Sequence, residues 1–253
     1  MNNMNPSPAS VPPQIPVRPA AASLTPLGDE PGEREPIASP VSAVEAILRQ
    51  PRRVLYQFRA GNTGGLVGRM LLVMVLCSVI YGVVVGTFSM GEQLWAAPVK
   101  IALGLLVSGL ICLPSLYIFA CLSGSQARLA ELCGLVAGLM MLMTILLVGF
   151  APVAWLFSQS TASLAWMGAL HLVFWFVATL FGLRFLQAGF AHSQARSRVG
   201  FYTWIVIFVL VMLQMTTALR PMVGKSATFL PTEKKFFLVH WGDHLGGAPA
   251  GQR

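Results

Sequence analysis

The sequence predicts an all-α fold: a polytopic membrane helix bundle with about five transmembrane helices. Hydrophobic residues make up 55% of the chain and charged residues only 10%, and the mean hydropathy is +0.70. A soluble domain carries about 25% charged residues, so lipid must be the solvent for most of this chain. The apolar residues also gather in five runs that short polar segments separate.

Each apolar run has roughly the length that a membrane-spanning helix needs, which is ~20 residues. The runs cover residues 71–90, 97–122, 132–157, 164–186 and 201–219. Because the segments between them are short, neighbouring helices should run antiparallel. We therefore expect a five-helix transmembrane domain over residues 62–219.

The rest of the chain divides into two tails and a pre-membrane region. Residues 1–41 hold ten of the seventeen prolines, and such a segment is expected to be disordered because it cannot build a core. The alternative is a proline-rich docking strip, because residues 13–19 contain two P-x-x-P matches. Residues 42–61 should form an amphipathic pre-membrane helix region, and residues 220–253 a short extracytoplasmic tail.

Local signals place the start of the pre-membrane helices. Ser42 and Glu45 fit the capping box, in which a serine and an acidic residue three positions later satisfy free backbone N–H groups. Pro51 then either breaks this helix or begins a second one.

The segment after Pro51 is amphipathic, with Val54, Leu55 and Phe58 on one helix face and arginines around them. This helix either lies on an anionic bilayer surface or packs on the bundle, and both can hold. Arg52 and Arg53 are therefore candidate interaction residues.

The distribution of Lys and Arg orients the chain, because cytoplasmic loops of membrane proteins are enriched in both. With five spans, nine arginines flank the side of the N-terminus: Arg49, Arg52, Arg53, Arg59, Arg69, Arg128, Arg184, Arg196 and Arg198. The opposite side has Lys100, Arg220, Lys225, Lys234 and Lys235. The bias predicts a cytoplasmic N-terminus, and Lys100 and Arg184 lie close enough to helix ends to reach water.

Ionisable residues inside membrane spans usually mark function, and this chain has almost none. His171, in the fourth run, is the one titratable group clearly within a span. We expect it to form an interhelical hydrogen bond, and a proton relay or ligand role is the alternative. Gln214 and Arg220, near the end of the fifth run, are further candidate polar or interaction residues.

Small residues and prolines predict how the helices pack. Glycines four positions apart make a flat helix face that lets two backbones approach closely. Packing inside one bundle is the favoured interpretation of these pairs, and a homo-oligomer face is the alternative. Prolines inside the spans should kink their helices. The candidate helix-packing residues are Gly82, Gly86, Gly134, Gly138, Pro114 and Pro152.

The sequence contains no catalytic constellation, and no cofactor or metal site is expected. It has no P-loop, no G-x-S-x-G and no H-E-x-x-H pattern. Its four cysteines fit small buried hydrophobic residues better than a disulfide framework. His240, Asp243 and His244 lie close together, but nearby glycines disfavour the helix that would align two zinc ligands. A membrane enzyme would need a cluster of ionisable groups at one membrane face, and these three residues with Arg220 are the single candidate in the sequence. We expect that the protein is not an enzyme.

The basic residues are scattered between apolar runs rather than gathered in one stripe, so no nucleic-acid partner is expected. Two local signatures resemble those of a family of uncharacterised bacterial multi-pass membrane proteins. One is Leu113-Pro114-Ser115-Leu116-Tyr117-Ile118-Phe119 followed by Ser123-Gly124-Ser125, and the other is Gln214-Met215 followed by Leu219-Arg220-Pro221 and Gly224. The layout as a whole resembles the Yip family of membrane adaptors. These resemblances imply a bacterial inner-membrane protein without catalytic residues.

Two functional hypotheses follow. The first is a non-enzymatic membrane adaptor or scaffold of the Yip-like type, surrounded by the lipid bilayer, with a protein partner bound through the N-terminal tail. The second is a small transporter or permeability factor with a cavity near His171 that residues such as Gln214 line. Homo-oligomer formation through the glycine faces is a further prediction.

Overall fold

The computed structural model describes residues 25–61, 63–89, 93–160, 164–193 and 199–218. In these residues the chain forms seven α-helices and one short 3-10 helix, and no strand. The predicted all-α fold class is therefore confirmed. The elements are η1 (Pro31–Arg34), α1 (Pro40–Arg49), α2 (Pro51–Arg59), α3 (Thr63–Ser89), α4 (Gln93–Leu122), α5 (Leu129–Ser160), α6 (Leu164–Ala191) and α7 (Val199–Ala218).

Four helices, α3 to α6, are long and apolar enough to cross a membrane. The fifth predicted span corresponds to α7, which is apolar and has 20 residues. At ~1.5 Å per residue such a helix is about 30 Å long, close to the thickness of the hydrocarbon core. Length and composition thus support four spans directly, and the fifth stays a prediction.

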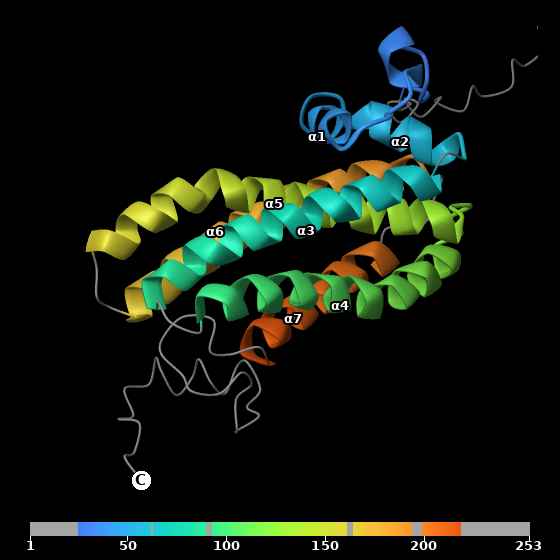
Figure 1. The fold of residues 1–253 in the computed structure, drawn as a ribbon. Helices are drawn as coiled ribbons and strands as arrows, with labels where there is room; N and C mark the ends of the chain where they lie inside the picture. The colour runs from blue at the N-terminus through green and yellow to red at the C-terminus, as the bar shows by residue number, and fades with distance from the viewer. Residues whose placement is uncertain (1–24, 62, 90–92, 161–163, 194–198, 219–253) are drawn as a thin grey trace, which may run out of the picture.

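The long helices are arranged in two layers (Figure 1). Helices α3, α5 and α6 form one layer, and α4 and α7 form the other. α3 packs along both α5 and α4, α6 packs along α5, and α7 packs along α4. Successive bundle helices alternate in direction, and α1 and α2 lie together over one end of the bundle, against α3 and α5 (Figure 1). We call residues 25–61 the cap, and the end of the bundle beneath it the cap end.

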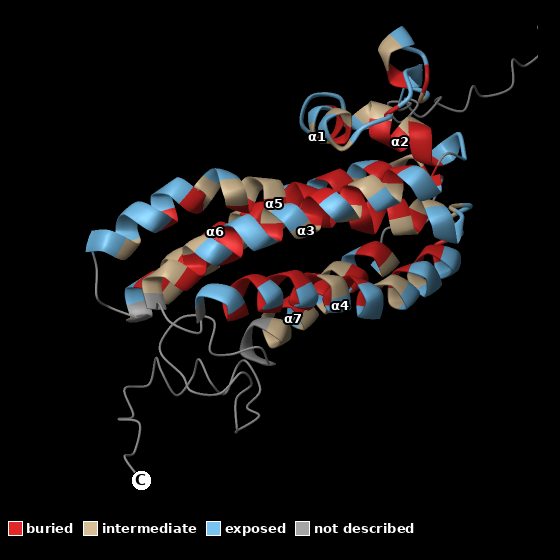
Figure 2. Cartoon of the chain, in the orientation of Figure 1, coloured by how far each residue is buried: buried red, intermediate tan, exposed pale blue. Residues whose placement is uncertain are grey.

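Helix α5 is the most enclosed of the four candidate spans. In its most apolar window 72% of the residues are buried, against 33–39% in the other three helices. Figure 2 shows this buried stretch in the middle of the bundle and an exposed C-terminal end of the same helix. Pro152 lies at the start of that exposed end and is itself exposed. α5 therefore forms the core against which the other helices are placed.

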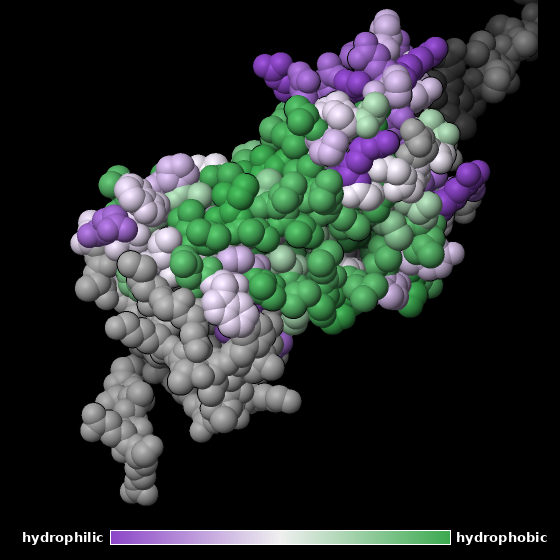
Figure 3. Space-filling view, viewed as in Figure 1, coloured by the Kyte–Doolittle hydropathy of each residue, from purple (hydrophilic) through white to green (hydrophobic). Residues whose placement is uncertain are grey.

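The outward faces of the helices carry large apolar side chains (Figure 3). In water this surface would be unfavourable, since a soluble monomer rarely exposes a contiguous apolar patch above a few hundred Å². Its exposed members include Leu110, Ile118, Val173, Phe176 and Val206. This belt is what a lipid-facing surface requires.

Several hydroxyl side chains within the bundle donate to the backbone of their own helix. The hydroxyls of Ser78 and Ser108 each donate to the carbonyl four residues earlier, over 2.7 Å, and Thr144 donates to the carbonyl of Met141 over 3.0 Å. Local bonds of this kind satisfy a buried hydroxyl without a partner on another helix.

Helix α1 begins three residues earlier than the sequence indicates. Ser39 is its N-cap and accepts from the Ser42 N–H over 3.0 Å, while the Ser42 hydroxyl oxygen accepts from the Ser39 N–H over 2.9 Å. The predicted capping box of Ser42 with Glu45 is therefore wrong. Pro51 begins the separate helix α2, which is one of the two predicted alternatives.

Candidate functional site beneath the cap

Residues 25–39, which we call the strap, lie across α1 and α2 on the cap end. Gly28, Glu33 and Ile37 are buried, although most of their neighbours in the strap are exposed. The prediction of disorder through residue 41 is therefore wrong for residues 25–41. The segment is ordered because polar contacts to its backbone, rather than a hydrophobic core of its own, hold it in place.

Glu33 and Arg52 form the central contact of the strap. The Arg52 guanidinium donates to one Glu33 carboxylate oxygen, and the Gly28 N–H donates to the other. The hydrogen bond from Arg52 holds the pKa of Glu33 below its ordinary value despite desolvation of the carboxyl group, and it raises the pKa of Arg52. Arg52 also donates to the Thr25 hydroxyl and the Pro26 carbonyl, each over 2.9 Å.

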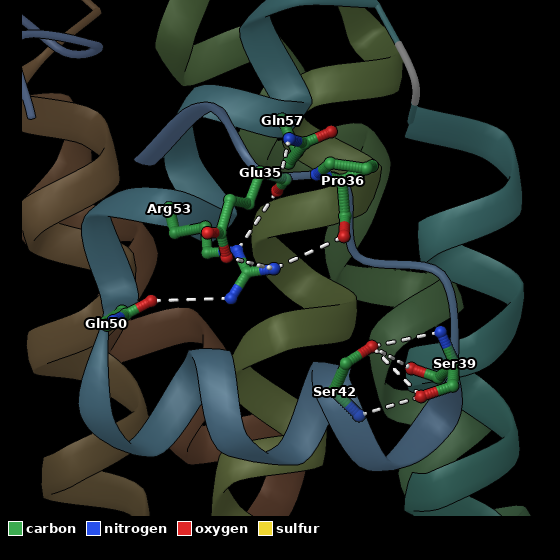
Figure 4. Close-up of polar contacts among 7 residues, drawn as sticks. All are labelled: Glu35, Pro36, Ser39, Ser42, Gln50, Arg53 and Gln57. Atoms are coloured by element: carbon green, nitrogen blue, oxygen red, sulfur yellow. Dashed lines mark hydrogen bonds and ion pairs between the residues drawn. The ribbon is translucent and has the colours of Figure 1, made fainter. Parts of the chain in front are cut away.

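Arg53 holds the second half of the strap (Figure 4). Its guanidinium donates to the carbonyls of Glu35 and Pro36, over 3.0 and 3.2 Å, and lies 3.5 Å from the Glu35 carboxylate. Gln57 donates to the same Glu35 carbonyl over 3.0 Å. Further along, Arg69 of α3 donates to the carbonyl of Ile37 over 2.8 Å.

These contacts give Arg52 and Arg53 a role that the sequence does not reveal. Both residues are candidate interaction residues in the sequence, but in the structure their guanidiniums are engaged by the strap. The apolar face of the same helix meets the bundle, as one of the two predicted alternatives requires: Val54, Leu55 and Phe58 are buried.

Two glycines of the bundle allow the cap to approach closely. A Cβ atom on Gly134 of α5 would lie 2.7 Å from the ring of Phe58, and one on Gly189 of α6 would lie 3.0 Å from Leu55. A side chain on Gly134 would force the Phe58 ring of α2 to move, whereas one on Gly189 would first meet Leu135 of α5, at 2.3 Å. The predicted packing glycine Gly134 therefore serves the contact between cap and bundle.

A cavity of about 580 Å³ lies between the strap, the end of α2 and the end of α6. Its lining residues are Pro26, Leu27, Tyr56, Arg59, Ala60, Ala191 and His192. A smaller recess adjoins it through Leu27, Arg59 and His192 and reaches Glu131. Polar and apolar atoms line this cavity in similar measure, and its volume is large enough for a small ligand or a headgroup.

Arg59 and His192 are two of the polar residues that line the cavity, with Tyr56. The Arg59 guanidinium donates to the backbone carbonyl of His192. The His192 ring has its Nδ1 atom 2.9 Å from the carbonyl of Ala188. A carbonyl only accepts, so Nδ1 carries the hydrogen, and in a neutral ring Nε2 is a free acceptor. This Nε2 atom is buried and has no hydrogen-bond partner in the described structure.

A second polar contact lies within the bundle, far from the cap. The Tyr81 hydroxyl of α3 and Nδ1 of His171 on α6 are 2.7 Å apart, so His171 makes the interhelical hydrogen bond that we expect from the sequence. Phe174 packs edge-on against the imidazole, and Phe150 stacks on Phe174. Nε2 of His171 is buried and has no partner in the described residues.

The other predicted polar residues are dispersed. Gln214 is half-buried on α7 and has an interaction partner. Lys100 is only 1% exposed and also has a partner, so the expectation that it reaches water is wrong. Arg184 is exposed and lies over the ring of Phe181, 5.7 Å from its centroid. Arg220 lies outside the described residues.

The predicted packing glycines Gly82 of α3 and Gly138 of α5 lie at helix crossings. A Cβ atom on Gly82 would lie 2.4 Å from the Cα atom of Pro98 on α4, and one on Gly138 would lie 2.5 Å from the ring of Phe185 on α6. Gly86 is buried as well. These contacts fit packing inside one bundle, and the homo-oligomer face stays a prediction. Pro114 lies inside α4 and is exposed.

The described residues contain no group of three His, Cys, Asp or Glu side chains that could hold a metal ion. The four cysteines are free thiols. His240, Asp243 and His244 fall outside the described part of the chain, as do the P-x-x-P matches in residues 13–19.

Some important residues carry no signal in the sequence. Trp204 of α7 is fully buried, and its indole N–H donates to the carbonyl of Cys112 on α4 over 2.9 Å. This bond ties α7 to the bundle, yet Trp204 reads as one more apolar residue in the fifth run. Tyr81 is hidden in the same way in the first run. In the sequence, the only indication of such a contact between helices is a side chain with one polar atom in an otherwise apolar run.

No protein-family model, curated protein or solved structure matches this chain.

Proposed function

We propose that the protein is a non-enzymatic membrane adaptor or scaffold of the Yip-like type. The observation that carries this proposal is the cap, a polar structure that the chain builds on one end of the bundle. Its own arginines fix the strap, and its apolar face is docked on α5 and α6. A polar platform on a bundle of apolar helices is suited to present a surface to a partner at the membrane.

We further propose that the cap faces the cytoplasm of a bacterial inner membrane. The support is the excess of arginines at the cap end, where Arg59, Arg69 and Arg128 lie. The proposal includes α7 as the fifth span, which puts the two termini on opposite sides.

Topology can be tested with single cysteines in a background without the four native ones. Ala38→Cys in the strap should react with a membrane-impermeant maleimide only after permeabilisation, whereas Ser160→Cys at the other end should react in intact cells. A tag after Arg253 should be accessible from outside if α7 spans. Reaction of Ala38→Cys in intact cells would overturn the orientation, and a cytoplasmic tag would remove the fifth span.

The adaptor role can be tested by affinity purification of partners in a mild detergent. The full chain is compared with a variant that lacks residues 1–24 and one that lacks residues 1–37, because only the second removes most of the strap. Arg49→Gln is a control, since Arg49 is exposed and pairs only with the exposed Glu45 among the described residues. We expect at least one partner to be lost with the strap. Partners that stay bound to all variants would remove the strap from the adaptor role.

A second candidate function is a small transporter or permeability factor. The observation that favours it is the buried His171 with its unpartnered Nε2 atom inside the bundle. Proteoliposomes loaded with a pH-sensitive dye provide a simple test for proton permeation. A transporter that uses His171 should dissipate a pH gradient faster than its His171→Leu variant, whereas an adaptor should leave both at the rate of empty liposomes.

A further inference from the structure

The five arginines of the cap fall into two groups. Arg49, Arg52 and Arg53 each pair with a glutamate of the cap. Arg34 and Arg59 have no acidic partner among the described residues, and of these two only Arg59 lines the cavity, since Arg34 donates to the Gly28 carbonyl. Within the described residues the Arg59 guanidinium donates only to a backbone carbonyl. Its positive charge therefore remains available at the wall of the cavity, in contrast to the neutralised charges of the three paired arginines.

Three residues with polar side chains line the cavity: Arg59, His192 and Tyr56. The Arg59 guanidinium has five N–H donors in a planar fork, which matches two oxygens of a phosphate group. Nε2 of His192 is a buried acceptor without a partner, because Nδ1 uses its hydrogen for the carbonyl of Ala188. An acceptor of this kind requires a hydroxyl or another donor from the ligand. The complement is an anion that also carries a hydroxyl group.

The position of the cavity indicates the source of such a ligand. Arg59 and Ala60 lie just before the candidate span Thr63–Phe88, and Ala191 ends the candidate span Trp166–Ala191. The cavity is thus level with the ends of two spans, where lipid headgroups lie. Glu131 lines only the recess behind it, so its carboxylate keeps a phosphate group in the outer cavity beside Arg59.

We infer that the cavity beneath the cap binds a phosphodiester that carries hydroxyl groups, as in the glycerol headgroup of an anionic phospholipid. Arg59 pairs with the phosphate oxygens, Nε2 of His192 accepts from a headgroup hydroxyl, and the Tyr56 ring with Leu27 covers the carbon atoms. The inference does not depend on the adaptor role.

Native mass spectrometry of the full-length protein in a neutral detergent tests the site. The protein is offered phosphatidylglycerol, phosphatidylmethanol (which has the same charge but no hydroxyl) and phosphatidylcholine. We expect phosphatidylglycerol to be retained best, phosphatidylmethanol less and phosphatidylcholine least. Arg59→Gln should reduce retention of phosphatidylglycerol about tenfold, the scale of a charge-assisted hydrogen bond. The control Arg49→Gln should retain it as the wild type does. Equal retention by the wild type and Arg59→Gln would overturn the inference.

Two further variants separate binding from folding, because Arg59 also bonds to the His192 carbonyl. Ala60→Trp fills the cavity and leaves Arg59 in place, so it should abolish selective retention. His192→Phe should keep the anion preference and reduce the preference for phosphatidylglycerol over phosphatidylmethanol about fivefold, the scale of one neutral hydrogen bond. Unchanged selectivity in Ala60→Trp would place the lipid elsewhere and overturn the assignment.

The same phosphodiester chemistry also exists in soluble form. Glycerophosphoglycerol, the headgroup without its acyl chains, should not displace phosphatidylglycerol at equal concentration, because the lipid is confined to the level of the cavity. Displacement that depends on Arg59 would overturn the lipid as the source and assign a soluble phosphodiester.

Discussion

Arg52 of α2 donates to the carboxylate of Glu33, a buried residue 19 positions earlier in the chain. This one contact joins the strap to the cap helices. Because the carboxylate is buried, loss of Arg52 leaves a charge without its strongest partner.

Arg52→Ala should therefore release the strap while the transmembrane bundle stays folded. We expect a loss of about 1.5–3 kcal/mol in the local stability of residues 25–37, the range for a hydrogen bond to a charged group. Hydrogen exchange followed by mass spectrometry should show faster exchange in the strap and unchanged exchange in α5. Arg49→Ala, on the exposed face of α1, is the matched control. Equal protection of the strap in both variants would contradict the role of Arg52.

The same contact predicts a pH dependence. The folded-state pKa of Glu33 lies below the ordinary value of 4.5 for a glutamate, so the carboxylate stabilises the strap above pH ~4.5. That contribution is lost as the pH falls through the folded pKa. Hydrogen exchange of the strap, corrected for the intrinsic pH effect, should be constant from pH 7 to 5 and increase below. Glu33→Gln should already be less protected at pH 7 and show no such transition, whereas a transition retained in this variant would point to another group.

The capping box of α1 leads to a separate test. Ser39→Ala should destabilise α1 by about 1 kcal/mol, the usual cost of removing an N-cap side chain. Glu45→Gln should have a smaller effect, because Glu45 makes only an exposed pair with Arg49. Hydrogen exchange of residues 40–49 measures both. A larger effect of Glu45→Gln would instead favour the box with Ser42 as N-cap.

The fold class and the cap differ in how far the sequence predicts them. Apolar runs of membrane length predict helices directly, because each helix satisfies the hydrogen bonds of its own backbone. The prediction therefore does not depend on which helices lie beside it. The strap gives no such signal. Its proline-rich composition is typical of disorder, and the carbonyls that fix it are bound by residues 17 to 32 positions away, such as Arg53 and Arg69.

The candidate site is still harder to predict from sequence. Arg59 and His192 meet across 133 positions of the chain, through a contact to a backbone carbonyl that no side-chain pattern records. His171 is recognisable because it is a titratable group in an apolar run. Its partner Tyr81 is not, because an aromatic residue in such a run reads as part of the core.

Two glycines of α3 provide an internal comparison for helix packing. A Cβ atom on Gly82 would meet the backbone of Pro98, which cannot move aside as a flexible side chain can, whereas Gly68 has nothing within 4 Å of its Cβ position. Gly82→Ala should destabilise the bundle by about 1–3 kcal/mol, as overpacking usually does. Gly68→Ala should be neutral or stabilising by up to ~1 kcal/mol, because alanine favours the helix. Thermal unfolding of the purified protein in detergent should rank the two variants in this order.

The hydrogen bond between Tyr81 and His171 gives the last prediction. Tyr81→Phe keeps the ring but removes the hydroxyl, so Nδ1 of His171 loses its partner. The unfolding free energy should fall by about 0.6–1.7 kcal/mol, the range measured for hydrogen bonds between membrane helices. Tyr117→Phe is the matched control, because Tyr117 lies on the outward face of α4 and is 40% exposed. His171→Leu should cost less when Tyr81 is already Phe, because the shared bond is then absent. Additive effects of the two substitutions would show that the bond does not contribute to stability.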